Sequence, residues 1–311
     1  MTDLILHHYP QSPFAEKARL MLGFKGLSWH SVMIPPVMPK PDLTALTGGY
    51  RRTPVLQVGA DIYCDTALIA RRLEQEKSAP ALFPEGQEAA AASLAQFADQ
   101  VLFQHAVAIN FQPKGLAERF AGMPEQVIKG FVADRQKLFS GGTASRLEAD
   151  VALGQWPALL SRLETQLERD GDFLLGGQPC IADFAHYHAL WFVASNRAVA
   201  DALEPYVAVR AWMGRMRGIG HGSHTDLSAE AAIDIARQAS PAPLPADAIS
   251  SPAGLSVGQA VAVSAVDYGT DDVAGTLVYE GAEEIIIARE DERAGLLHVH
   301  FPRFGFRVRA A

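Results

Sequence analysis

Cysteine, long apolar segments and runs of basic residues are the scarce features of this sequence. Only Cys64 and Cys180 occur among 311 residues, with neither the spacing of a metal site nor the number that a disulfide framework needs. No apolar stretch is long enough to span a bilayer, and residues 1–5 lack the basic region and cleavage site of a signal peptide. These absences exclude a disulfide-stapled secreted scaffold and predict a soluble, cytoplasmic protein without a membrane partner.

The balance of charge argues against nucleic acid as a partner. The chain carries 27 Lys and Arg against 35 Asp and Glu, a formal net charge of -8, whereas binding to a phosphate backbone needs clustered positive charge. The basic residues are instead spread along the chain. With 49% hydrophobic residues, a chain of this length predicts two or three globular domains.

The first 80 residues alternate short apolar strands with helical patterns. Ser12 and Pro13 are typical of a helix start, and the proline-dense segment 35–41 predicts a loop. The expected order is strand, helix, strand, helix or loop, two strands and a helix, which is the thioredoxin-like pattern for residues 1–80. The expected strands are residues 4–9, 27–34, 54–58 and 61–64, and the expected helices are residues 14–24 and 66–76.

Two further regions have different periodicities. Residues 88–238 show helical periodicity throughout, which predicts an all-helical domain without strands. A linker rich in Pro, Ala and Ser begins at residue 240. In residues 250–311 apolar and polar residues then alternate with a period of two, which predicts a small five-stranded β-barrel. The expected fold class is therefore multidomain: α/β, all-α and small β. The expected strands after the linker are residues 257–266, 275–279, 284–289, 296–301 and 306–308.

The segment that joins the first strand to the first helix offers two hydroxyl groups. A cysteine thiol with a pKa near ~8.5 is mostly protonated at neutral pH. A hydroxyl donor together with the positive end of a helix can stabilise its thiolate. Ser12 lies where both effects coincide, and Tyr9 is the competing hydroxyl. The simpler alternative is that Ser12 only caps the helix.

Two more segments could hold the backbone and the charged ends of a short peptide. A cis bond between Thr53 and Pro54 would let Val55 present its N–H and C=O to an extended ligand. Arg52 or Arg51 could then pair with a carboxylate of that ligand.

At the next helix start, Asp65 could bind an ammonium group and Thr66 a carboxylate, although such pairs are also ordinary helix caps. Together with the hydroxyls, the order and spacing of these segments indicate a glutathione site.

These motifs resemble those of the glutathione S-transferase family. Ser12-Pro13-Phe14 is similar to the opening of its serine-type members, residues 52–56 to its Pro-Val-Leu segment, and Asp65-Thr66 to its acidic residue–Ser pair. Residues 179–184 resemble its buried capping box, with Cys180 in place of a hydroxyl. The resemblance covers residues 1 to about 235. It implies a thioredoxin-like domain, a helical domain, glutathione as co-substrate and a homodimer; the region after residue 250 lies outside it.

The remaining candidates are weaker. Cys64 is expected to be a core residue, because no Cys-x-x-Cys motif accompanies it. The electrophile pocket is expected between the domains, with candidate residues on the first helices of the helical part. His186 and His188 are expected to be packed or surface histidines rather than metal ligands, since no third metal ligand is in register with them. No metal is therefore expected. The electrophile-pocket candidates are Phe103, His105, Asn110 and Phe111.

The sequence thus predicts a transferase that adds glutathione thiolate to a small hydrophobic electrophile. Ser12 or Tyr9 would activate the thiol, and residues 53–55 would hold the cysteinyl backbone. Arg52 or Arg51 would pair with the glycyl carboxylate, and Asp65 with Thr66 would hold the γ-glutamyl end. One alternative is a non-catalytic scaffold that binds a protein through residues 250–311. A related isomerase or dehalogenase is another.

Overall fold

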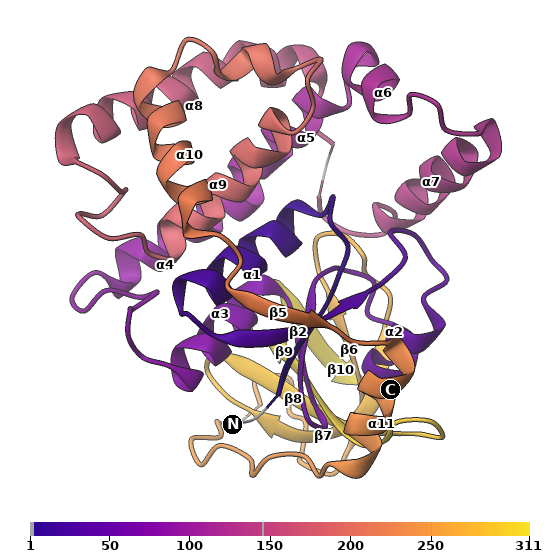
Figure 1. Ribbon diagram of the computed structural model, residues 1–311. Helices are drawn as coiled ribbons and strands as arrows, with labels where there is room; N and C mark the ends of the chain where they lie inside the picture. The colour runs from indigo at the N-terminus through magenta and orange to yellow at the C-terminus, as the bar shows by residue number, and fades with distance from the viewer. Residues whose placement is uncertain (1–2, 145, 250) are drawn as a thin grey trace.

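A helical layer lies above a long, twisted sheet in the computed structural model, which describes residues 3–144, 146–249 and 251–311 (Figure 1). The sheet has ten strands in the order β10-β6-β7-β8-β9-β4-β3-β1-β2-β5. In the described part of the chain no helix is long and apolar enough to cross a membrane. The strands are β1 (Leu4–His8), β2 (Ser28–Met33), β3 (Val55–Val58), β4 (Asp61–Cys64), β5 (Ser223–Asp226), β6 (Ala260–Ala265), β7 (Val273–Glu280), β8 (Glu284–Asp291), β9 (Gly295–Pro302) and β10 (Phe306–Ala310).

The N-terminal part has the predicted thioredoxin-like arrangement. Strand β1 pairs with β2 in parallel and with β3 in antiparallel orientation, and all five of its residues are buried because helices or other strands cover both of its faces. The proline-dense loop is followed by a short helix that begins at Pro41, so the expected "helix or loop" contains both. The helices of this part are α1 (Pro13–Phe24), α2 (Pro41–Thr47) and α3 (Thr66–Glu76).

The middle of the chain forms the predicted helical domain. Its first long helix is interrupted by a π-helical turn, η1, and a helix over residues 113–119 was not expected from the sequence. The elements are α4 (Glu88–Phe97), η1 (Ala98–Leu102), α5 (Phe103–Asn110), α6 (Pro113–Arg119), α7 (Glu125–Leu138), α8 (Ala149–Asp170), α9 (Ile181–Ala194), η2 (Ala200–Leu203), α10 (Val207–Ile219) and α11 (Ala229–Gln238).

The expectation that residues 88–238 contain no strand was wrong. Strand β5 pairs in parallel with β2 and extends the N-terminal sheet. After α10 the chain comes back to the N-terminal sheet and passes close to the end of α1. Glycine is needed at this point, since a Cβ at Gly23 would lie 2.1 Å from the carbonyl oxygen of Gly220. The strand is short and fully exposed, so it has no alternating apolar pattern by which the sequence could reveal it. Helix α11 then packs against α2 and β9.

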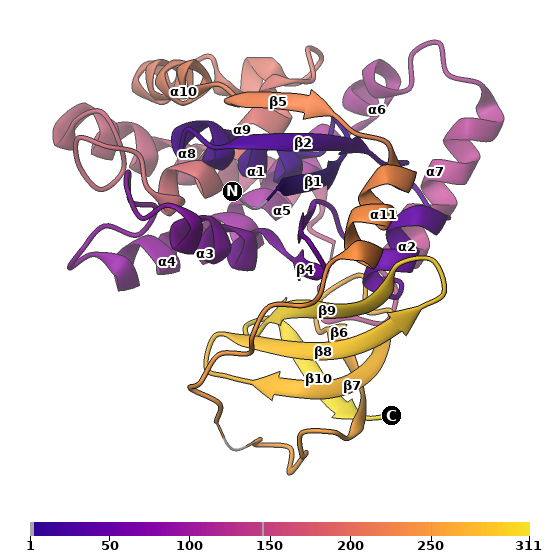
Figure 2. The ribbon, with the colours of Figure 1, turned by 60° about the horizontal axis from the view of Figure 1, so that its bottom comes forward.

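The five strands predicted after the linker are all present, and they continue the N-terminal sheet. Strand β9 lies beside β4 (Figure 2) and pairs with it in parallel. In this ladder Asp61 stands opposite His298, and Tyr63 stands opposite His300. One hydrophobic core spans the junction, because Ile62 and Val55 belong to the same buried cluster as Phe301. The C-terminal sheet therefore covers the free edge of β4, and unpaired edges are sites of unwanted association.

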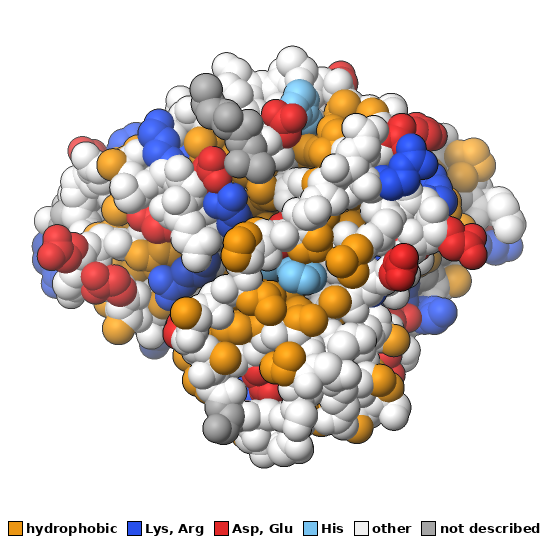
Figure 3. Space-filling view, turned by 90° about the horizontal axis from the view of Figure 1, so that it is seen from below, with side chains coloured by type: hydrophobic (Ala, Val, Ile, Leu, Met, Phe, Trp, Pro, Cys, Tyr) orange, Lys and Arg blue, Asp and Glu red, His pale blue; other side chains and the backbone are white. Residues whose placement is uncertain are grey.

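A loop of the C-terminal sheet also reaches the helical domain. The backbone N–H groups of Thr143 and Ala144 donate to the carbonyls of Val266 and Asp267, at 3.0 Å each. Gly142 is required for this approach, since a Cβ there would lie 1.7 Å from the Asp267 carbonyl oxygen. Residues 266–269 are thus held by the α7–α8 connection. On the underside of the molecule (Figure 3), apolar side chains gather over the middle, and Lys and Arg form no continuous patch.

The capping box of α9 centres on Asp183. Its carboxylate accepts hydrogen bonds from the backbone N–H groups of Cys180 (3.0 Å) and Leu174 (2.9 Å) and from Nε1 of Trp212 (2.9 Å). The thiol of Cys180 lies 3.4 Å from the same carboxylate. Asp183 is fully buried, and its bond from the Trp212 indole connects α9 to α10. The side chain of Cys180 stands in the place of the capping hydroxyl toward the N–H of Asp183.

Candidate functional site

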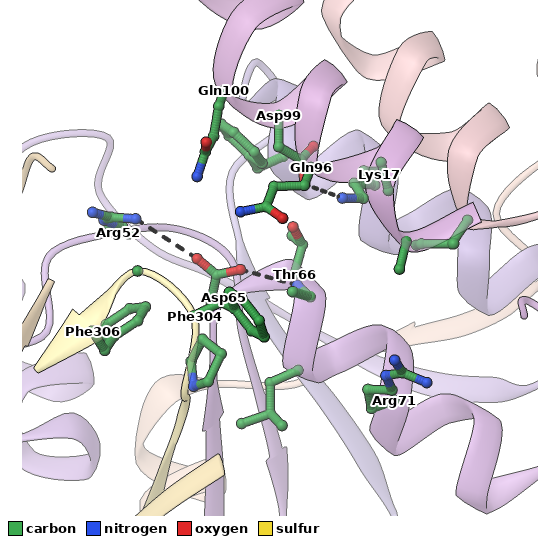
Figure 4. Close-up of a pocket in the computed structure, with 18 of the residues that line it drawn as sticks. Lys17, Arg52, Asp65, Thr66, Arg71, Gln96, Asp99, Gln100, Phe304 and Phe306 are labelled. Atoms are coloured by element: carbon green, nitrogen blue, oxygen red, sulfur yellow. Dashed lines mark hydrogen bonds and ion pairs between the residues drawn. The ribbon is translucent and has the colours of Figure 1, made fainter. Parts of the chain in front are cut away.

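A cavity of about 380 Å³ lies where the three parts of the chain meet (Figure 4). This volume is within the range of small-molecule sites. Its walls come from α1, the segment before β3, the start of α3, the α4–η1 region and three loops of the C-terminal sheet. The residues with polar or aromatic side chains among its lining are Phe14, Lys17, Tyr50, Arg52, Thr53, Asp65, Thr66, Arg71, Phe83, Ser93, Gln96, Asp99, Gln100, Asp267, Tyr268, Glu283, Phe304 and Phe306.

The start of α3 carries a strained residue that faces this cavity. Asp65 has φ 74° and ψ 141°, and it is the one described non-glycine residue with positive φ. Its carboxylate accepts from the N–H of Ala67 at 3.0 Å. Burial raises the pKa of Asp65, while Arg52 and the Ala67 N–H oppose this effect. Strain of this kind persists where the surrounding structure enforces it and is common at binding sites. Asp65 and Thr66 both line the cavity, as a ligand site requires.

Arg52 connects the start of α3 to the C-terminal sheet. Its guanidinium lies 3.7 Å from the Asp65 carboxylate and forms a second ion pair with Asp267. It also stacks over the ring of Tyr268, 3.9 Å from the ring centroid. Arg51, the other candidate for a ligand carboxylate, pairs with Asp134 at 2.7 Å. Both arginines therefore form ion pairs with carboxylates of the protein itself, and the ion pair with Arg52 orients the side chain of Asp65.

The bond between Thr53 and Pro54 is cis, as the sequence predicted. Both residues line the cavity, whereas the side chain of Val55 is buried in the core of the sheet. The hydroxyl of Thr53 accepts from Nζ of Lys40 at 3.0 Å. Burial, with the nearby Arg135, lowers the pKa of Lys40 to about 8. Lys40 is a cation that the sequence analysis missed, because the proline-dense loop around it shows no motif.

Ser12 and Tyr9 lie beside the cavity but outside its lining residues. Ser12 is buried, and its hydroxyl accepts from the N–H of Ala15 at 3.2 Å, which is the geometry of an N-cap. Tyr9 is half-buried. The buried guanidinium of Arg19 donates to the carbonyls of Tyr9 (3.4 Å) and Pro10 (3.1 Å), so it fixes the loop from the inside. The assignment of either hydroxyl to a thiol stays a prediction.

A buried ion pair closes the opposite wall of the cavity. Lys17 on α1 is fully buried, and its Nζ lies 2.6 Å from the carboxylate of Asp99 in the π-helical turn η1. The other oxygen of Asp99 accepts from Nε2 of His188 on α9 at 2.8 Å. A π-helical turn shifts the register of side chains and is frequent at functional sites. The three residues join the thioredoxin-like part to the helical domain. His188 is packed rather than on the surface, the two placements that the sequence left open.

This ion pair predicts an acid-dependent loss of stability. Burial opposes ionisation of Asp99, but Lys17 and His188 outweigh it and lower its pKa from 3.8 to about 2. Because the folded pKa is depressed, the contribution is fully present above about pH 4 and is lost as the pH falls toward 2. We expect the stability advantage of the wild type over Asp99→Asn to shrink by ~1–2 kcal/mol between pH 6 and pH 3.

Urea unfolding at several pH values measures this difference. Asp201→Asn, which removes an exposed ion pair with Lys114, serves as the control and should show no such pH dependence. A constant gap between wild type and Asp99→Asn would contradict the assignment.

The expected electrophile residues lie behind the cavity wall. His105 forms hydrogen bonds with Gln155 and the Val101 carbonyl, both at 2.8 Å, and Asn110 donates to the Phe192 carbonyl at 2.7 Å. Neither they nor Phe103 and Phe111 are among the lining residues. The wall is formed earlier along the chain, by Gln96, Asp99 and Gln100 on α4 and the π-helical turn.

Comparison with known proteins gives this architecture a family. The model of the glutathione S-transferase N-terminal domain matches residues 6–81, and that of the C-terminal domain matches residues 119–219. A GST-like protein from Pseudomonas syringae is 52% identical over 100% of both chains, with a TM-score of 0.85. The chain belongs to the glutathione S-transferase family. The resemblance seen in the sequence is thereby confirmed, and the C-terminal sheet lies within the full-length match.

More distant members of the family share the fold alone. A glutathione S-transferase from Rhodospirillum rubrum F11 is 19% identical over 69% of this chain and 87% of its own, with a TM-score of 0.53. The β-etherase LigF from Sphingobium sp. strain SYK-6 is 17% identical over 70% and 95%, with a TM-score of 0.51. No curated protein matches the chain at a significant level. Glutathione is the substrate of this family, and its members bind small electrophiles.

Proposed function

We propose that this protein is a glutathione transferase that joins the glutathione thiolate to a small hydrophobic electrophile in the cavity described above. The observation that supports this most is the strained Asp65 with Thr66 at the start of α3, beside cis Pro54 and facing the cavity. The carboxylate of Asp65 would bind the glutathione ammonium group. The Thr66 hydroxyl and the N-terminus of α3 would bind the adjacent carboxylate. The backbone around Thr53 and Val55 would hold the cysteinyl residue as an added strand.

Activation of the thiol would come from positioning and pKa tuning. The cysteinyl sulfur would lie near the N-terminus of α1, where the helix dipole and the hydroxyl of Ser12 favour the thiolate. Ser12 would have to turn its proton toward the sulfur while its oxygen keeps the bond from Ala15. Tyr9 remains the competing donor. The electrophile would occupy the part of the cavity between Phe14, α4 and the aromatic side chains Phe304 and Phe306.

The thiolate absorbance of bound glutathione tests this assignment. With the protein saturated, we expect a midpoint at least about one pH unit below the ~8.5 of a free thiol, moving up in Ser12→Ala. Ser228→Ala removes a similar serine cap outside the cavity and should leave the midpoint unchanged. If Tyr9→Phe shifts the midpoint and Ser12→Ala does not, the hydroxyl assignment is wrong. No bound thiolate at all would contradict the transferase proposal.

The alternative of a scaffold that uses residues 250–311 for a partner gains no specific support from the structure. These residues pair with β4, share its core and contribute Tyr268 and Phe306 to the cavity, which is a role within the enzyme itself. A substrate screen would distinguish conjugation from isomerisation or dehalogenation. We also propose that the protein is cytoplasmic and forms the homodimer that is typical of the family.

A further inference from the structure

A second cluster of polar side chains lies at the junction of the two parts of the sheet. Asp61 on β4 stands opposite His298 on β9 in the parallel ladder, and His300 follows two residues later. Because side chains alternate between the faces of a strand, the two histidines share one face. All three are at least four-fifths buried, with side-chain exposures of 6%, 13% and 7%. None of them lines the cavity described above.

The ring nitrogens of both histidines converge on one carboxylate oxygen. Oδ1 of Asp61 lies 3.0 Å from Nε2 of His300 and 3.8 Å from Nδ1 of His298. The second distance is too long for a hydrogen bond, and this buried nitrogen has no hydrogen-bond partner among the residues that the structure describes. Burying such a group without a partner is unfavourable. The orphaned nitrogen therefore points to a ligand shared with Asp61.

The ligand atoms have the spacing of a metal site. They all lie within 4.8 Å of one another. Tetrahedral zinc, with bonds of about 2.0–2.1 Å to nitrogen and oxygen, places its ligand atoms roughly 3.3 Å apart. The two measured distances to Asp61 lie on either side of this value, so small side-chain movements would suffice. Two imidazoles and one carboxylate suit zinc and related transition metals rather than calcium or magnesium.

Hydrogen bonds from neighbouring residues orient the side chains of Asp61 and His300. The other ring nitrogen of His300, Nδ1, faces Oε2 of Glu284 at 3.2 Å, and a carboxylate in this position fixes the tautomer of a metal-binding histidine. With Nδ1 protonated, Nε2 carries the lone pair that a metal needs. The remaining oxygen of Asp61 accepts from the N–H of Ala242 at 2.8 Å, and the ring of Tyr63 stacks on His300.

We propose that Asp61, His298 and His300 bind one zinc ion per chain, with Glu284 as a positioning residue and the fourth coordination position open. The ion would link β4 of the thioredoxin-like part to β9 of the C-terminal sheet. It would thereby stabilise the junction that brings the C-terminal loops to the cavity. The site is independent of the proposed transferase reaction, because no residue is shared between the two.

Equilibrium dialysis of the untagged, chelator-treated full chain against zinc chloride tests the proposal. We expect about one zinc per chain, a higher melting temperature with zinc, and visible absorption of four-coordinate cobalt when cobalt chloride replaces zinc. His298→Asn should weaken zinc binding more than about 10-fold, and Glu284→Gln by about 10–100-fold. His298→Asn disturbs no hydrogen bond of its Nδ1, so it is expected to fold, which far-ultraviolet circular dichroism can verify.

His224→Ala is the matched control, since it removes an exposed histidine on β5 and should leave zinc binding unchanged. Less than stoichiometric binding in the wild type would overturn the proposal. Equal affinity in wild type and His298→Asn would overturn it as well.

Discussion

Asp65→Asn is expected to weaken glutathione binding by about 10–100-fold. This follows from the ~1.5–3 kcal/mol of a hydrogen bond to a charged group, which the amide cannot form as a carboxylate does. Asparagine caps helices as well as aspartate and tolerates positive φ, so the start of α3 should be preserved. The substitution therefore isolates the charge of Asp65 from its structural role. Isothermal titration calorimetry with glutathione measures the change in Kd.

Asp272→Asn provides the control for this experiment. Asp272 pairs with Arg309 at the exposed edge of the sheet and is outside the cavity lining, so the same change in charge should alter Kd less than about 2-fold at physiological salt. An unchanged Kd in Asp65→Asn would show that glutathione does not use this carboxylate. The γ-glutamyl end would then have to be placed elsewhere.

Asp183→Ala is expected to destabilise the protein by ~3–5 kcal/mol, the largest effect on folding that the structure predicts. The substitution leaves two backbone N–H groups and the indole N–H of Trp212 buried without an acceptor. Each such group costs ~1–3 kcal/mol, although the costs are not additive. It also removes one half of the capping box of α9. Urea unfolding followed by circular dichroism measures the loss.

Two further variants test whether the loss of stability comes from the hydrogen bonds of Asp183 rather than from the loss of any helix cap. Ser228→Ala removes the solvent-exposed capping hydrogen bond of helix α11 and should cost only ~1 kcal/mol. Cys180→Ser restores a hydroxyl at the N-cap of α9 and should stabilise the protein by up to ~1 kcal/mol. If Asp183→Ala is no more destabilising than Ser228→Ala, the hydrogen bonds of Asp183 do not contribute the stability predicted for them.

The sequence predicted those parts of the site that are encoded locally. Thr53-Pro54 and Asp65-Thr66 are adjacent residues whose backbone geometry follows from their own chemistry, and the structure places all four at the cavity. Lys17 and Asp99 were missed because neither stands out alone. Their pairing depends on how α1 packs on the helical domain, and that packing has no local signal.

The same reasoning explains what was missed in the C-terminal part. Its five strands were predicted from the alternation of apolar and polar residues. The pairing of β9 with β4 was not predicted, since the pattern of a strand does not specify which strand lies beside it. The proposed zinc ligands depend on that pairing. The sequence predicts no metal, because no third ligand is in register with His186 and His188. Asp61 and His298 are instead far apart in sequence and become neighbours only in the ladder.

The placement of β9 beside β4 has a consequence for synthesis on the ribosome. Strand β4 and the start of α3 emerge early, whereas the residues that cover the edge of β4 and complete the cavity wall, up to Phe306, emerge last. During most of translation the nascent chain therefore exposes an unpaired strand edge, a surface prone to aggregation. We expect chains truncated before β9 to depend strongly on chaperones. The wall of the cavity is complete only when the final strands have left the exit tunnel.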